Sequence, residues 1–187
     1  SVSLIGDELK GGNKWGGGVA AADGCIYGIP REAERVLRID TATQRVDTIG
    51  ESLGNGDKWC SGVLGGDGCV YGIPCNAERV LHIEPRPPDG DRSAEPRVTL
   101  IGESLGEGGE KWEGGALGAD GRIYASPRSA DHVLCIDVAT QAAYRVGPSL
   151  KELGYNKFNC GAVAAADGCI YAVLNFDHGK LLRIAPP

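Results

Sequence analysis

The chain has 187 residues with 30 glycines, 2 phenylalanines, no methionine and a formal net charge of -6. This length can bury the core of one domain, and the glycine content favours tight turns and closely packed strands over long helices. Because the chain has no basic run and no long apolar run, we expect a soluble protein with no nucleic-acid partner, no anionic membrane surface and no membrane span.

The predicted elements begin with residues 1–9, which match in sequence the fourth-strand segment at 97–105. The first full repeat unit follows at 13–50. Its β-branched and aromatic residues, glycine-rich start and Asp-Gly turn predict four antiparallel strands, and helical periodicity is nowhere sustained. The four predicted strands are 15–22, 25–29, 35–40 and 44–49.

Three further units of the same kind follow, at 57–102, 110–147 and 156–187. Each unit carries an Asp-Gly turn and a tyrosine, and the tyrosines are 44, 53 and 47 residues apart. A strand-rich repeat of about 45 residues is typical of propeller blades. The second unit contains a proline-rich segment, 84–96, predicted to be a mobile inserted loop between its third and fourth strands. The aligned tyrosines are Tyr27, Tyr71, Tyr124 and Tyr171.

The two chain ends complement one another in this pattern. The last unit ends with a third-strand segment at 180–184, and residues 1–9 match a fourth strand. We therefore predict a single all-β domain over residues 1–187, a four-bladed β-propeller with four antiparallel strands per blade. In this prediction the N-terminal strand completes the fourth blade and removes the open sheet edges.

The segment from Asp23-Gly24-Cys25-Ile26-Tyr27 to Val36-Leu37-Arg38-Ile39-Asp40 and Thr43 resembles kelch-like and quinoprotein-like propeller repeats. These repeats combine a DGxIY hairpin with a later hydrophobic-Asp-x-x-Thr turn. The resemblance covers all four units and implies a propeller fold. Propellers include binding, scaffold and catalytic proteins, so the resemblance selects no function.

Two sets of candidate ligand-binding residues are predicted on one face, where the loops from fourth to first strands meet those from second to third strands. A lysine and an aromatic residue recur at the start of each unit, suited to an anionic or sugar ligand. The alternative is that the aromatic residue packs between blades and the lysine caps a turn. A second set lies in the loops after the second strands, where solvated surface charge is the alternative. The first set is Lys14, Trp15, Lys58, Trp59, Lys111, Trp112, Lys157 and Phe158, and the second is Arg31, Asn76, Arg128 and Asn175.

The seven cysteines cannot all pair within the chain, so we expect free thiols and a reducing compartment. Cys25, Cys69 and Cys169 occupy one repeat position and are predicted to be small buried thiols. Cys60 and Cys160 align on inner strands, where a metal between them is conceivable, but the chain has no close-spaced Cys and His pair of the zinc type. We therefore predict no metal site and no cofactor.

Few features favour catalysis. The histidines are His82, His132 and His178, and no nucleophile elbow or phosphate loop is present. His132 and His178 follow Asp131 and Asp177 in matching loops, and such pairs could act as general acid and base. No catalytic residue is assigned.

We predict a non-catalytic binding or scaffold module that engages a protein partner or a larger assembly through its loop face. The first alternative is a glycan-binding propeller that uses the Trp and Lys ring. The second is a metal-assisted hydrolase in the central channel. Because the sequence contains no methionine, we expect a processed chain or part of a longer precursor.

Overall fold

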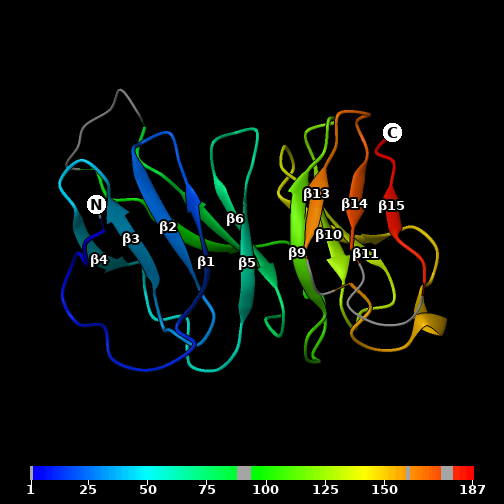
Figure 1. The fold of residues 1–187 in the computed structure, drawn as a ribbon, viewed down its shortest axis with the longest axis horizontal. Coiled ribbons are helices and arrows are strands. Elements are labelled where there is room, and N and C mark those ends of the chain that lie inside the picture. The colour runs from blue at the N-terminus through cyan, green and yellow to red at the C-terminus, as the bar shows by residue number, and fades with distance from the viewer. Residues whose placement is uncertain (1, 88–93, 159–160, 174–178) are drawn as a thin grey trace.

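The computed structural model describes residues 2–87, 94–158, 161–173 and 179–187. It contains fifteen strands in four antiparallel sheets and one short 3-10 helix, η1 (Lys151–Leu153). In Figure 1 the first sheet lies on the left and the second in the middle, and the third and fourth lie on the right, where they overlap in this view. No helix in these ranges is long and apolar enough to cross a membrane.

The first two blades each have four strands in sequential order. The first contains β1 (Trp15–Ala20), β2 (Cys25–Pro30), β3 (Val36–Asp40) and β4 (Arg45–Ile49), and the second contains β5 (Trp59–Leu64), β6 (Val70–Pro74), β7 (Val80–Glu84) and β8 (Arg97–Ile101).

The third blade repeats this order, and the fourth has three described strands. The third contains β9 (Trp112–Leu117), β10 (Ile123–Pro127), β11 (Val133–Asp137) and β12 (Ala142–Val146), and the fourth contains β13 (Ala162–Ala164), β14 (Ile170–Ala172) and β15 (Leu182–Ile184).

The inner strands β1, β5, β9 and β13 lie next to one another in that order. Small residues are needed there because the backbones approach closely: a Cβ atom on Gly114 would lie 2.5 Å from the Cα of Gly161. The expected crowding of the inner strands is therefore confirmed at this contact.

The hydrophobic core consists of three clusters, one between each pair of neighbouring blades. Tyr27 and Ile29 of the first blade pack with Trp59 and Leu81 of the second in one of them. The second and third sheets are therefore covered on both faces by their neighbours, as the apolar second strands predict, whereas the first and fourth sheets each have one neighbouring sheet in the described ranges.

The predicted insertion does lie between the third and fourth strands of the second blade, from the end of β7 to the start of β8. Its described ends contact the first blade: Arg86 lies 3.9 Å from Asp23, and Glu95 binds Arg38 at 3.0 Å. Residues 88–93 lie outside the described ranges.

The expected pairing of residues 2–5 with β15 is not found in the described part of the chain. The fourth sheet has the order β13-β14-β15, and Val2 and Leu4 are fully exposed, at 101% and 100%. The two chain ends lie on opposite sides of the molecule (Figure 1). Closure of four blades into a ring is therefore not seen.

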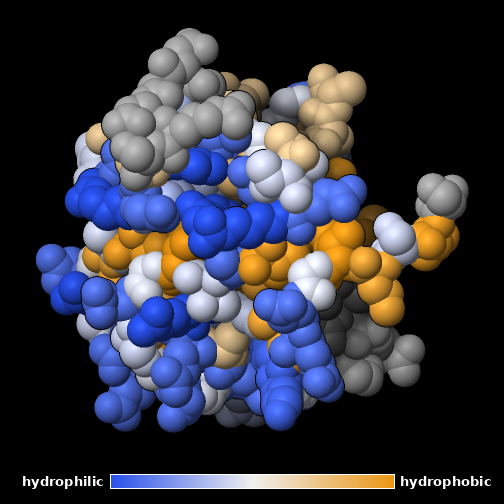
Figure 2. Space-filling model, turned by 90° about the vertical axis from the view of Figure 1, so that its left-hand side faces the viewer, coloured by the Kyte–Doolittle hydropathy of each residue, from blue (hydrophilic) through white to orange (hydrophobic). Residues whose placement is uncertain are grey.

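The N-terminal segment instead lies against the first blade. A Cβ atom on Gly6 would lie 2.7 Å from Cγ2 of Val46 in β4. Figure 2 views the side of the molecule at which the first blade lies and shows a band of apolar side chains between hydrophilic surfaces. Val2, Leu4 and Ile5 are among the large hydrophobic residues exposed in the structure.

Candidate functional site

The two expected loop sets do lie side by side on one face. The loop before each first strand donates a backbone hydrogen bond to the loop after the second strand of the preceding blade. The same 2.7 Å bond occurs three times: Leu53 N to Glu34 O, Leu105 N to Glu78 O and Leu150 N to Asp131 O. This repetition makes the loop face one continuous surface.

The lysines of the first predicted set bind backbone carbonyl oxygens. Lys58, Lys111 and Lys157 are buried, at 8%, 6% and 0% exposure. Burial lowers the pKa of each of these ammonium groups. Their Nζ atoms donate to Arg31 O and Gly56 O, to Asn76 O and Gly108 O, and to Ser129 O and Ala130 O, and Lys14 Nζ donates to Leu9 O and Gly11 O.

The aromatic members of this set are packed into the protein. Trp59, Trp112 and Phe158 are at most 2% exposed, so their ring faces are not open to a ligand. Trp15 keeps partial exposure. The indole nitrogens donate to backbone oxygens twenty residues onward: Trp15 to Arg35 at 3.0 Å, Trp59 to Arg79 at 2.9 Å and Trp112 to His132 at 2.9 Å. This geometry corresponds to the alternative in which Trp packs between blades and Lys caps a turn.

The second predicted set joins each blade to the next. The side chain after each second strand reaches the residue that precedes the lysine of the following blade. Asn175 lies outside the described residues. The contacts are Arg31 to both carboxylate oxygens of Asp57 at 2.9 and 3.0 Å, Asn76 Oδ1 accepting from Glu110 N at 2.6 Å, and Arg128 Nε to Asn156 Oδ1 at 2.9 Å.

A groove of about 710 Å3 opens on the loop face at the third blade. Both loop sets line it, through residues of the loop before β9, of the loop after β10 and of the loop that follows β12. Tyr155 is 80% exposed at this groove. The charged or titratable side chains of the lining are Glu107, Lys111, Asp131, His132, Arg145 and Lys151.

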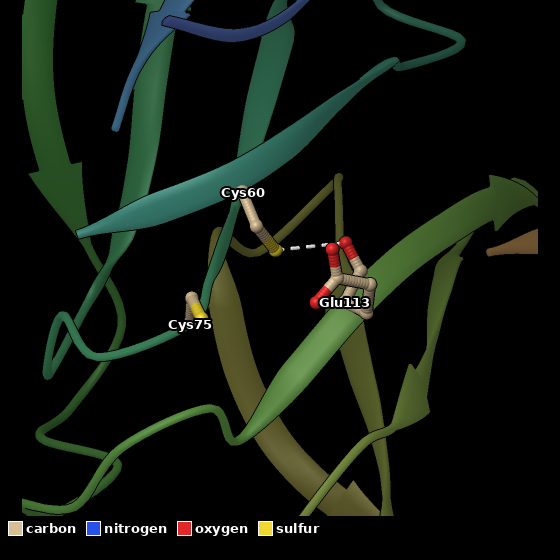
Figure 3. Close-up of side chains that lie close together, drawn as sticks. All are labelled: Cys60, Cys75 and Glu113. Carbon is tan, nitrogen blue, oxygen red and sulfur yellow. Dashed lines mark hydrogen bonds between the residues drawn. The ribbon is translucent and has the colours of Figure 1, made fainter. Parts of the chain in front are cut away.

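A second polar cluster lies on the inner strands. Cys60, Cys75 and Glu113 place one potential ligand atom each within 4.8 Å of one another (Figure 3). The Cys60 thiol donates to Glu113 O at 2.8 Å, and Arg128 binds the Glu113 carboxylate at 3.0 Å. Hydrogen bonding to Cys75 and burial raise the pKa of Cys60, while the same bond lowers the pKa of Cys75. All three groups thus already have partners within the protein.

This cluster differs from the expected pair of inner-strand cysteines. Cys160 lies outside the described residues, so its distance from Cys60 is not addressed. Cys75, whose position relative to Cys60 the sequence did not predict, lies just after β6 and comes close because Trp59 pairs with Pro74 across a register shift. The strand register, rather than a sequence motif, assembles the cluster.

The candidate acid and base pair is only partly described. Asp131 and His132 line the groove, whereas Asp177 and His178 lie outside the described residues. The backbone oxygen of His132 accepts the indole hydrogen bond of Trp112.

No protein-family model and no curated protein matches the chain. Solved structures do match it, and those similar structures are β-propeller-like proteins. A catalytically inactive virginiamycin B lyase from Staphylococcus aureus with Quinupristin has a TM-score of 0.64 at 14% identity, over 96% of this chain and 58% of that chain.

Two other matches have different functions. Hydrazine synthase from Kuenenia stuttgartiensis has a TM-score of 0.61 at 16% identity, over 98% of this chain and 49% of that chain. An auxiliary nutrient binding protein from Bacteroides thetaiotaomicron has a TM-score of 0.55 at 16% identity, over 91% of this chain and 38% of that one. The chain thus spans little more than half of the lyase and less of the others. At this identity the likeness shows a propeller-like fold alone.

Proposed function

We propose that the protein is a non-catalytic binding propeller whose loop face engages a protein partner. The groove on the loop face at the third blade carries this proposal, because its volume of about 710 Å3 is within the range of ligand sites. Loops held by a rigid sheet scaffold are also favoured binding positions.

The chemistry of the groove favours a polypeptide segment. Tyr155 offers an exposed aromatic ring, and aromatic side chains are common anchors at protein interfaces. Glu107 and Asp131 provide negative charge, while Arg145 and Lys151 provide positive charge. A partner with both charges next to an apolar side chain complements this lining.

A combinatorial peptide display library, selected against the 187-residue protein, tests the proposal. We expect selected peptides to lose at least about tenfold in affinity on Tyr155→Ala, equivalent to about 1.4 kcal/mol. Tyr144→Ala is the matched control, because Tyr144 is also exposed, at 42%, but lies outside the groove. Peptides that bind both variants equally, or a library that yields no binder, would contradict the proposal.

Glycan binding is the second candidate, and exposed Tyr155 supports it better than the buried rings of Trp59 and Trp112. Sugars stack on open aromatic faces, and Tyr155 has such a face beside polar groups. A glycan array would separate the two candidates. Saturable sugar binding that Tyr155→Ala removes, with no selected peptide, would favour the glycan.

We further propose that residues 2–5 form the fourth strand of the fourth blade, which would complete the ring and its loop face. A cavity of about 410 Å3 next to β15, lined by residues of β12 and its exit, supports this. The register of β11 and β12 pairs Ile136 with Ala143 and Cys135 with Tyr144. By repeat equivalence, Val2 would pair with Ile184 and Ser3 with Arg183.

Disulfide trapping tests this register. We expect Ser3→Cys and Arg183→Cys to crosslink within one chain in the double variant, and Leu9→Cys with Arg183→Cys to serve as the unopposed control. Mixing the two single variants detects closure between two chains instead. Absence of any Ser3–Arg183 crosslink under oxidation would refute the strand pairing.

A further inference from the structure

A second group of side chains of the types that can ligate metals lies on the face opposite the loop face, in the second blade. Asp67 is in the turn from β5 to β6, Cys69 directly precedes β6, and His82 is in β7. One ligand atom from each lies within 4.8 Å of the others. Strand pairing produces this arrangement, because Tyr71 of β6 stands opposite His82 of β7.

The imidazole of His82 is buried with an unused nitrogen. His82 is 2% exposed, and its Nε2 is the one buried side-chain nitrogen or oxygen without a hydrogen-bond partner among the described residues. Its Nδ1 lies 3.4 Å from Thr99 Oγ1. Burial lowers the pKa of His82, so the ring is neutral at neutral pH and can offer a lone pair. An unsatisfied buried nitrogen is costly unless a ligand uses it.

Asp67 lacks the cation that its equivalents in the first and third blades have. In the first blade Arg86 lies 3.9 Å from Asp23 and 3.4 Å from the Cys25 sulfur. In the third blade Arg122, at the position of Cys69, binds Asp120 at 3.1 Å. Asp67 forms no ion pair within the described ranges.

The repeat position of His82 also holds arginine in two other blades. These are Arg38 in the first and Arg183 in the fourth, where Arg183 donates to Tyr171 OH at 3.3 Å. The second blade has replaced a guanidinium by a neutral ligand nitrogen and kept the carboxylate and the thiol. A positive charge is therefore missing at this repeat position, where the first and fourth blades supply one.

An ion can reach this group from solvent. Asp67 is exposed and lines a cavity of about 570 Å3 together with Asp120 and Asp137 of the third blade. Three carboxylates and one guanidinium, Arg122, make this cavity attractive to cations. The inner-strand cluster of Cys60, Cys75 and Glu113 has no such unused donor, since its groups bond to one another and to Arg128.

We propose that Asp67, Cys69 and His82 bind a thiophilic divalent cation, Zn²⁺ by the nature of the ligands, with water in the fourth position. Thiolate, imidazole and carboxylate are the ligand types of zinc sites, and a tetrahedral ion needs them about 3.5 Å apart. Side-chain movement of about 1 Å from the present spacing suffices. Ligation through Nε2 leaves Nδ1 to donate to Thr99 Oγ1, and such an outer hydrogen bond orients a ligating imidazole.

Binding releases one proton, because the Cys69 thiol becomes a thiolate bonded to the metal while His82 is already neutral. Burial raises the pKa of Cys69 to about 12, so the metal rather than the solvent must displace this proton. Glu84 and Arg97 are the other charged groups near this thiol, and they form an ion pair at 2.7 Å.

Titration of the metal-free 187-residue protein with Co²⁺, followed by competition with Zn²⁺, tests the proposal. We expect one equivalent of Co²⁺ to give a thiolate charge-transfer band and the visible bands of tetrahedral cobalt. Cys69→Arg and His82→Arg should abolish both while keeping the fold, since arginine occupies these positions in other blades. Thr99→Val should weaken Zn²⁺ binding about tenfold to 100-fold.

Two controls identify the site. Cys169→Ser changes the same repeat position in the fourth blade, and Cys75→Ser changes the inner-strand cluster, so both should leave the cobalt spectrum intact. Loss of the bands on Cys75→Ser but not on Cys69→Arg would assign the metal to the inner strands and overturn the proposal. So would the absence of any stoichiometric cobalt spectrum.

Discussion

Gly102, which directly follows β8, contacts Ala143 of β12 so closely that a Cβ atom on Gly102 would lie 2.9 Å from the Ala143 Cβ. In the first and second blades, the glycine after the fourth strand thus packs on the second residue of the next blade's fourth strand: Gly50 contacts Val98 as Gly102 contacts Ala143. Gly6 contacts Val46 in the same way. A Cβ on Gly147, the equivalent residue of the third blade, would have nothing within 4 Å. This contact is missing next to the fourth blade, in which the described residues form three strands.

Substitution of these two glycines by alanine should separate packing from backbone strain. Gly102 and Gly147 have φ angles of 75° and 78°, so both variants bear the same left-handed strain. Gly102→Ala alone meets a neighbour, and overpacking of this kind costs about 1 to 3 kcal/mol. The structure as described predicts that Gly102→Ala lowers the free energy of unfolding by that much more than Gly147→Ala, measured by urea denaturation. The proposed strand of residues 2–5 would cover Gly147 and make the two losses equal, so this comparison also tests ring closure.

Removing the indole nitrogen of Trp112 should weaken the contact between the first strand and the loop after the second. In Trp112→Phe the carbonyl oxygen of His132 loses its 2.9 Å hydrogen bond inside the protein. Phe158 fills the equivalent position in the fourth blade, so the fold accepts this ring. We expect a loss of about 1 to 3 kcal/mol in the free energy of unfolding, from the lost hydrogen bond and the smaller ring. Trp15→Phe, at a partly exposed position, should cost less, and the reverse order would contradict this account.

The strands were predictable from local sequence. Residues 25–29 and 44–49 were expected as strands, and the structure has Cys25–Pro30 and Arg45–Ile49. Alternating and β-branched residues between Asp-Gly turns determine such elements locally. Closure was not predictable in the same way, because it depends on the sum of small rotations between neighbouring sheets. Matching end sequences carry no information about that sum.

The candidate site was predictable only in part. The repeat alignment placed the two loop sets next to one another, as the structure has them. The recurring lysines Lys58 and Lys111, however, donate hydrogen bonds to backbone oxygens and are not exposed to a ligand. Tyr155 and Lys151 belong to a loop outside the aligned segments, so repeat comparison missed the groove. His82 could have been recognised from the sequence as a candidate ligand, because it occupies the repeat position that holds Arg38 in the first blade and Arg183 in the fourth. The sequence indicates this site through the presence of a neutral histidine at a repeat position that holds a charged arginine in two other blades.

Asp47 should contribute stability that is lost in acid. Arg38 donates two hydrogen bonds to it, at 2.8 and 2.7 Å, and they lower the pKa of the Asp47 carboxyl. Because the pKa of Asp47 is lower in the folded protein than in the unfolded chain, the ion pair contributes its full stability at pH values above the unfolded-state pKa of about 3.9. This contribution is lost as the pH falls through the folded-state pKa. Asp47→Asn should therefore be destabilised at pH 7, with a difference from wild type that shrinks below about pH 4. Denaturant titrations from pH 7 to 3 measure this, and a difference that does not depend on pH would exclude the ion pair as its source.

Lys111 should stabilise the loop face through its hydrogen bonds despite the cost of burying its charge. Its Nζ donates to Asn76 O and Gly108 O, both at 3.1 Å. Lys111→Met keeps the length of the side chain but leaves both oxygens without this donor, so we expect a loss of about 1 to 3 kcal/mol. Lys14→Met is the control, because Lys14 is only partly buried and should cost less.

The pH dependence of this variant gives an independent check. Burial lowers the pKa of Lys111 below its usual 10.5. Between the folded-state pKa of Lys111 and its higher unfolded-state pKa, this lysine is protonated in the unfolded chain and deprotonated in the folded protein. The free energy of unfolding of the wild type therefore rises with pH in that window. The methionine variant lacks this rise, and its deficit should grow as pH approaches 10.5. Burial also raises the pKa values of Tyr27, Tyr71 and Tyr124, which makes the free energy of unfolding fall with pH in the same range. This contribution is the same in both proteins, so it cancels when the free energy of unfolding of the variant is subtracted from that of the wild type. A deficit that stays constant or shrinks over this range would show that Lys111 is not buried as a charged donor.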